Sequence, residues 1–161
     1  MHDDLDPLVT PPGEEGPRDP VAVIVVDHGT RSPEVNAEFE ASVRAGAGLG
    51  SYGIVEPAHM ELAEPSLATA FGRCVAAGAT TIAVAPYFLG PGRHWDRDIP
   101  ALAEAAAADH PGVRWVVTRP LGPDQRLLDL VAERVARCLA HVVGEAGECA
   151  TCAGTGRCTL R

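Results

Sequence analysis

The chain has 161 residues, which suits one ordinary domain, and 46% hydrophobic with 22% charged residues is typical of a soluble globular protein. No segment reaches the roughly 18 consecutive apolar residues of a transmembrane helix, which argues against a membrane protein. With 13 Lys and Arg against 22 Asp and Glu, the net charge of -9 argues against a broad nucleic-acid surface.

The N-terminal segment, residues 1–19, is acidic and rich in proline. It has neither the basic and apolar regions of a signal peptide nor the Arg- and Ser-rich pattern of a transit peptide. We therefore expect a flexible arm on a cytoplasmic protein. A plastid location is expected only if a transit peptide has been removed.

The rest of the chain alternates extended and helical patterns. Short apolar runs rich in β-branched residues predict buried strands at residues 21–27, 54–60, 80–89 and 113–118. Helical segments are predicted after them, at residues 33–46, 65–78, 98–110 and 124–143. Ser32 and Asp98 are placed as N-caps. This order predicts an α/β fold in residues 20–143, with a doubly wound, four-stranded parallel sheet and helices on both faces.

Ligands of such sheets bind at the carboxyl ends of the strands, so the residues that follow the strands are the candidates for chemistry. His28 follows the first strand, His59 and Glu61 end the second, and His94 lies in the loop after the third. Two imidazoles can hold a divalent ion and accept protons, and a carboxylate can assist them. The alternatives are loop-capping histidines and a solvated glutamate. Strict alternation along the second strand would put His59 and Glu61 on the same side.

Charged and aromatic side chains near the same edge suggest a flat, polyanionic ligand. Trp95 and Tyr87 supply aromatic surface in a chain with only 4% aromatic residues. Guanidinium groups bind carboxylates or phosphates, although each could equally be a solvated loop arginine. The candidates are Arg31, Arg93, Arg97 and Arg119. Because one sheet of this size offers one wall of such a site, we expect a homodimer.

The C-terminal segment, residues 144–161, is predicted to be a Cys-rich tail that binds a metal centre. Cys149, Cys152 and Cys158 form a C-x2-C-x5-C array. Thiolates at this spacing suit zinc or an iron–sulfur cluster, and either needs a fourth ligand, for which Cys138 is the natural candidate. The alternative is free thiols on a disordered tail. Cys74 is expected to be a small core residue.

Four motifs in order, VDHGTRS, EPAHMELAEPS, APYFLGPGRHWDRDIP and RPLGP, resemble the sirohydrochlorin chelatases over about residues 21–143. These are short class II chelatases that insert Fe2+ or Co2+ into a reduced tetrapyrrole. Thr30 departs mildly from the family pattern, where Ser is common. The tail, GECATCAGTGRC, resembles that of the plant-type sirohydrochlorin ferrochelatases, which carry a 2Fe-2S cluster.

The resemblance implies the chelatase version of the doubly wound sheet, paired as a homodimer, and a reaction in siroheme (Fe2+) or cobalamin (Co2+) synthesis. It implies catalytic and metal-binding roles for His28, His94 and Glu61. Substrate contacts are expected from Arg31, Arg93, His59 and Trp95. Cluster ligands are expected at Cys149, Cys152, Cys158 and Cys138. A non-catalytic metal or iron–sulfur carrier, and a chelatase for another tetrapyrrole, remain the alternatives.

Overall fold

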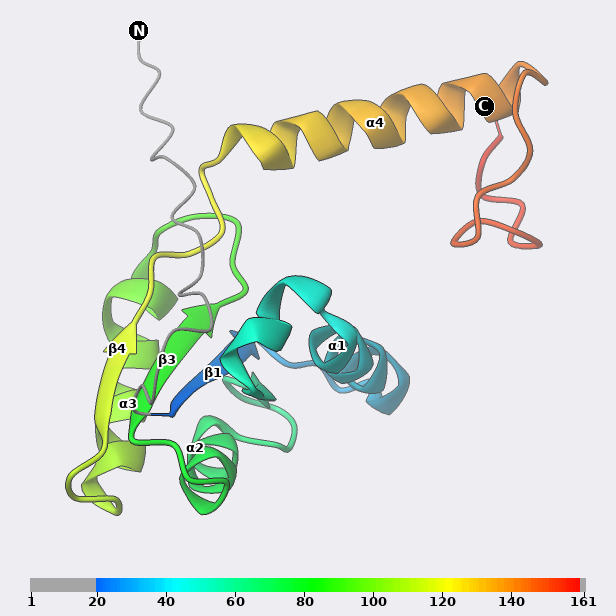
Figure 1. The fold of residues 1–161 in the computed structure, drawn as a ribbon. Coiled ribbons are helices and arrows are strands. Elements are labelled where there is room, and N and C mark those ends of the chain that lie inside the picture. Colours follow the sequence, from blue (N-terminus) through cyan, green and yellow to red (C-terminus); the bar gives the residue numbers. More distant parts are fainter. Residues whose placement is uncertain (1–19, 160–161) are drawn as a thin grey trace, which may run out of the picture. The chain divides into compact units, whose positions relative to one another are not determined.

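The structure is a computed structural model that describes residues 20–159, so the expected N-terminal arm at residues 1–19 lies outside the described residues. Four parallel strands form one sheet in the order β2-β1-β3-β4 (Figure 1). The strands are β1 (Val21–Asp27), β2 (Ile54–His59), β3 (Thr81–Pro86) and β4 (Arg114–Val117). The predicted parallel sheet is therefore confirmed.

A helix follows each strand, as predicted. The helices are α1 (Pro33–Ala45), α2 (Leu67–Ala76), α3 (Ile99–Ala108) and α4 (Gln125–Val142). A short 3-10 helix, Ala47–Tyr52, precedes β2, and one π-helical turn, His94–Asp98, leads directly into α3. In the part of the chain that the structure describes, no helix is long and apolar enough to cross a membrane.

The central strand β1 is buried on both faces, which explains its nearly continuous apolar sequence. Ala22, Ile24 and Val26 pack into the cluster that includes the buried residues of α2 and α3. Val23 and Val25 pack on the other face, where α1 supplies Val43. Figure 1 shows α1 on one side of the sheet and α2 and α3 on the other, so the predicted two-sided arrangement is confirmed.

The two predicted helix caps have different outcomes. Ser32 Oγ accepts a hydrogen bond from Val35 N at 3.4 Å and begins α1, as predicted. Asp98 makes no side-chain cap, so that prediction is wrong. The reason is that the backbone at Asp98 is already helical, with φ -75 and ψ -46, because the π-helical turn precedes it. Its carboxylate is therefore available for another partner.

The chain divides into two compact units between Leu121 and Gly122. The first contains the sheet and α1 to α3, and the second contains α4 and the Cys-rich tail. This division differs from the expected boundary at residues 143 and 144, because α4 groups with the tail. Each unit is described by itself below.

Candidate metal-binding site

Three of the predicted site residues meet at the carboxyl edge of the sheet. His28 follows β1, Glu61 lies just beyond β2, and His94 begins the π-helical turn after β3. His28 Nε2 lies 2.9 Å from Glu61 Oε1, and the ring centroids of His28 and His94 are 5.4 Å apart. Their side chains are 44%, 53% and 47% exposed, so a small ion can reach all three from solvent.

The sheet topology accounts for this convergence. β1 lies between β2 and β3. The chain runs from β1 to β2 on one side of it and then crosses to β3 on the other side. Such a reversal of strand order opens a crevice at the carboxyl ends. Beyond the strands, Met60 N donates to Asp27 O at 2.8 Å and Glu61 N donates to His28 O at 3.2 Å. These two bonds extend the β1–β2 pairing and hold Glu61 beside His28.

Gly29 allows the two segments to approach closely. Its φ is +80, a conformation that residues with a side chain rarely adopt, and a Cβ there would overlap the carbonyl oxygen of Glu61. Only a glycine leaves space for Glu61 at this position.

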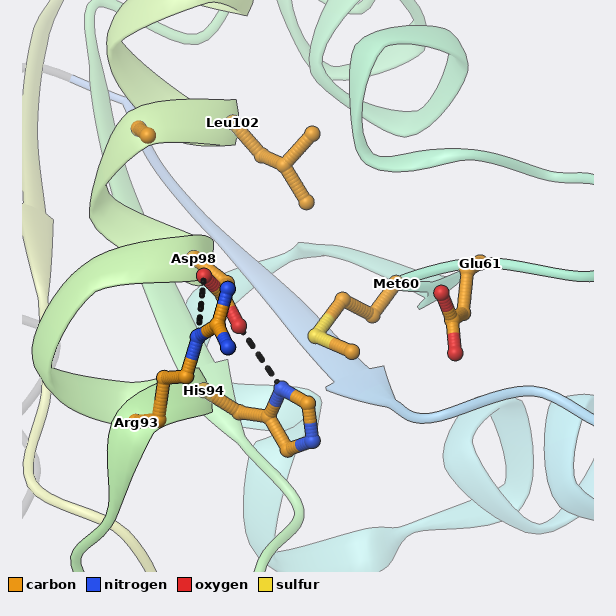
Figure 2. A pocket seen from close by; sticks show the side chains of 7 residues that line it. Met60, Glu61, Arg93, His94, Asp98 and Leu102 are labelled. Atoms are coloured by element: carbon orange, nitrogen blue, oxygen red, sulfur yellow. Dashed lines mark hydrogen bonds and ion pairs between the residues drawn. The ribbon is translucent and has the colours of Figure 1, made fainter.

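Asp98 orients His94 from within the same turn. His94 Nδ1 donates to Asp98 Oδ2 at 2.9 Å, and Arg93 Nε lies 3.8 Å from Asp98 Oδ1 (Figure 2). A carboxylate on one ring nitrogen fixes the ring and leaves the other for a metal. Sequence reasoning missed this role, although the i, i+4 spacing of His94 and Asp98 on a helix would have indicated it.

A cavity of about 580 Å³ opens beside these residues, within the size range of small-molecule sites. Figure 2 shows Met60 and Glu61 facing the His94 turn across this space, with Leu102 from α3 above it. The cavity therefore has both apolar and ligating walls. The lining residues are Met60, Glu61, Arg93, His94, Asp98, Ala101 and Leu102.

Three residues expected to touch substrate, His59, Trp95 and Arg31, are not among those that line the cavity. His59 is fully buried. The strict alternation that would put His59 and Glu61 on the same side does not extend to Glu61, because β2 ends at His59 and the chain bends from Met60 onward. Trp95 Nε1 donates to Thr118 O at 2.8 Å, which fastens the loop after β3 to the end of β4. Arg31 is exposed and is not one of the residues that line the cavity.

Within residues 20–159, no three or more His, Cys, Asp or Glu side chains are already arranged to hold a metal ion. His28 Nε2 and Glu61 Oε1 instead contact each other at 2.9 Å. An incoming cation would take the place of this contact, since a histidine ligand must present an unprotonated nitrogen to the metal.

The family model CbiX matches residues 22–138. This chain belongs to the CbiX family. It is 49% identical over 147 residues to the sirohydrochlorin ferrochelatase, chloroplastic, of Arabidopsis thaliana, which covers 91% of this chain and 65% of that protein. It is 31% identical over 139 residues to the sirohydrochlorin cobaltochelatase of Methanococcus maripaludis, which covers 70% of this chain and 96% of that protein.

Solved structures of the CbiX family agree with the fold. A cobalamin biosynthesis CbiX protein from Marinobacter aquaeolei VT8 superposes with a TM-score of 0.65 at 33% identity, covering 76% of this chain and 99% of that one. SirB from Bacillus subtilis with Fe3+ gives a TM-score of 0.66 at 33% identity, covering 71% of this chain and 45% of that one. The SirB of subspecies spizizenii in complex with cobalt gives 0.68 at 33% identity, over 72% and 50%.

The second unit of this CbiX-family chain gathers four thiols. A hydrogen bond with the Cys158 thiol is the main cause that raises the pKa of Cys138. Hydrogen bonds with Cys158 and Cys149 raise the pKa of Cys152 to about 12, whereas a backbone hydrogen bond from Cys152 lowers the pKa of Cys149. The thiols of the predicted set therefore influence one another's pKa, although in residues 20–159 they are not already arranged to hold a metal ion. Cys74 is buried in the core, as expected.

Proposed function

We propose that this chain inserts Fe2+ or Co2+ into sirohydrochlorin. The observation that carries the proposal is the meeting of His28, Glu61 and His94 beside an open cavity at the carboxyl edge of the sheet. The names of the curated relatives and the iron and cobalt in the SirB structures support the reaction and the metals.

The reaction replaces two pyrrole N–H protons by one divalent ion, so two protons must leave. His28 and His94 each expose an imidazole that can ligate the ion and accept a proton as it enters the macrocycle. Glu61, which pairs with His28, holds that ring in place and carries the negative charge that attracts the cation. No change in the oxidation state of the metal is needed.

The cavity also has groups that suit a flat ring with carboxylate side chains. Arg93 lines it and is 78% exposed, so its guanidinium can bind a substrate carboxylate. Met60 and Leu102 supply apolar surface for the ring. Exposed Arg31, three residues after His28 in sequence, is a second carboxylate partner in this proposal. His59 is not included because it is fully buried, and Trp95 is not included because its Nε1 donates to Thr118 O.

Iron is the metal that we favour, because the relative at 49% identity is a ferrochelatase and its alignment spans most of this chain. For the compartment, the chloroplastic relative at 49% identity supports the plastid alternative.

The test is anaerobic incubation of the purified chain with sirohydrochlorin and either Fe2+ or Co2+, followed by the absorption spectrum of the tetrapyrrole. We expect a spectral change that depends on protein and metal together. A chain that binds metal but neither binds nor metallates sirohydrochlorin would be a carrier. Insertion into protoporphyrin instead would change the substrate assignment.

Asp98→Asn should weaken metal binding, because the neutral amide holds the His94 ring less firmly than the carboxylate that now accepts from Nδ1. Loss of such a partner costs about 10- to 100-fold in metal affinity. Calorimetric titration with Co2+ measures the change. Asp96→Asn, on an exposed aspartate of the same turn, is the control and should bind as the unaltered chain does. Equal affinities for the two variants would contradict the role of Asp98.

We also propose that Cys138, Cys149, Cys152 and Cys158 hold a 2Fe-2S cluster. Four thiols are the donor set that such a cluster requires, and the contacts among them support the assignment. A cluster would fasten the tail to the end of α4, which carries Cys138. The proposed insertion chemistry uses only groups of the first unit, so we assign the cluster a structural or regulatory role.

Anaerobic purification should therefore yield iron and acid-labile sulfide in equal amounts, and Cys149→Ser/Cys152→Ser should lose both. A chain ending at Gly147 should retain insertion activity, because His28, Glu61 and His94 lie in the first unit. Zinc without sulfide would contradict the cluster. Loss of activity in a folded truncated chain would contradict its dispensability.

We further propose a homodimer as the working form, because the cavity is bounded on one side by the sheet edge and α3 and needs a second wall to enclose a macrocycle. Light scattering at assay concentration should give twice the chain mass. A fully active monomer would contradict the proposal.

A further inference from the structure

His59 is a buried polar side chain that the proposed insertion chemistry does not use. It is 0% exposed, and its Nδ1 donates to Asp27 Oδ1 at 2.6 Å. Its Nε2 has no hydrogen-bond partner among the described residues, and Glu40 Oε1 lies 3.7 Å away, beyond hydrogen-bond distance. An apolar ring of similar size would fill the site without leaving a buried nitrogen unsatisfied. What a histidine adds at this position, compared with an apolar ring, is therefore its hydrogen bond to Asp27.

That bond joins the two segments that carry His28 and Glu61. Asp27 Oδ1 also accepts a hydrogen bond from Gly29 N at 2.9 Å. One carboxylate oxygen therefore binds the backbone on the far side of His28 and the His59 ring at the end of β2. On the second segment, His59 N donates to Pro65 O at 2.8 Å, which anchors the start of the bend that contains Glu61. The imidazole thus connects the loop after β1 with the bend after β2.

We propose that His59 is a positioning residue, whose bond to Asp27 sets the separation and orientation of His28 and Glu61 for the metal ion. This inference rests on the proposed function. His59 has no exposed surface, so it acts through the two segments and not by contact with substrate. The Phe39 ring supports its placement, with 5.7 Å between the centroids of the two rings.

Two substitutions separate the hydrogen bond from the packing of the ring. His59→Phe keeps a ring of similar size and removes the N–H donor. His59→Asn removes the ring and keeps an N–H donor near the position of Nδ1. Each variant is titrated with Co2+ in the absence of tetrapyrrole, and the visible spectrum of the bound ion reports its coordination geometry. His110→Asn, on a half-buried histidine that stacks on Phe71 and does not line the cavity, is the control.

We expect His59→Phe to weaken Co2+ binding by about 10- to 100-fold, as loss of a group that orients metal ligands does, and to change the spectrum of the bound ion. His59→Asn should bind closer to the unaltered chain, and His110→Asn should match it. Unchanged binding by His59→Phe, or tighter binding by His59→Phe than by His59→Asn, would overturn the inference, because the ring would then act by packing alone.

If His59→Phe does not fold, the same bond is tested by substituting its acceptor, Asp27. Asp27→Ala and His59→Leu should each weaken Co2+ binding, and Asp27→Ala/His59→Leu should lose little more than Asp27→Ala alone, because both changes remove the same bond. Additive losses would overturn the inference. An unaltered chain that neither binds Co2+ nor metallates sirohydrochlorin would overturn the proposed function and this inference together. An active unaltered chain with a fully active His59→Phe overturns the inference alone.

Discussion

His28→Ala and His94→Ala should each lower the rate of metal insertion by about 100-fold or more, the range for loss of a group that transfers protons. Each change removes an imidazole whose ring centroid lies 5.4 Å from the other and whose side chain is about half exposed. Neither ring belongs to the buried core, so the fold should survive. Initial rates with sirohydrochlorin and Fe2+, together with thermal unfolding, measure both effects.

His110→Ala controls for the loss of a histidine elsewhere in the first unit and should retain the full rate. Glu61→Gln should be milder than either histidine change, because the amide keeps the shape and a hydrogen bond to His28 but loses the charge. Full activity in both His28→Ala and His94→Ala would contradict the proposal that these histidines form the metal-insertion site. Loss of activity in His110→Ala as well would indicate general destabilisation.

Much of the first unit could be predicted because its strongest signals are local. Residues 21–27 show the continuous apolar pattern of a strand buried on both faces, and β1 has these bounds. The third strand was harder to delimit. Its apolar pattern continues through Leu89, but β3 ends at Pro86 and Leu89 is 75% exposed. An apolar run alone does not show where the backbone leaves the sheet.

The part of the candidate site that could be predicted is the part that the arrangement of parallel strands determines. Residues that directly follow parallel strands share an edge, and this rule brought His28, Glu61 and His94 together from one sequence. It did not assign Asp98 to His94, because a rule about strand ends says nothing of contacts within one helical turn, where the i, i+4 spacing is the signal. The topology rule also could not show that His59 is buried. At the end of a strand, a shift of one residue along the chain exchanges a buried position for an exposed one.

Gly29→Ala should destabilise the chain and disrupt the metal site together. A residue with a side chain at φ +80 costs about 1–2 kcal/mol of unfolding free energy. In addition, the new Cβ overlaps the carbonyl oxygen of Glu61 and lies close to the Cβ of His59, so the bend after β2 must move. That movement separates Glu61 from His28, whose side chains are now 2.9 Å apart. We therefore expect a lower thermal midpoint and weaker Co2+ binding.

Gly53→Ala is the matched control, because Gly53 has a φ of +75 and a Cβ there would meet nothing within 4 Å. It should show the backbone cost alone, with unchanged Co2+ affinity and insertion rate. The difference between the two variants then isolates the close approach of the His28 and Glu61 segments. If Gly29→Ala loses no more stability than Gly53→Ala and binds Co2+ equally well, the approach of these segments does not determine the geometry of the site.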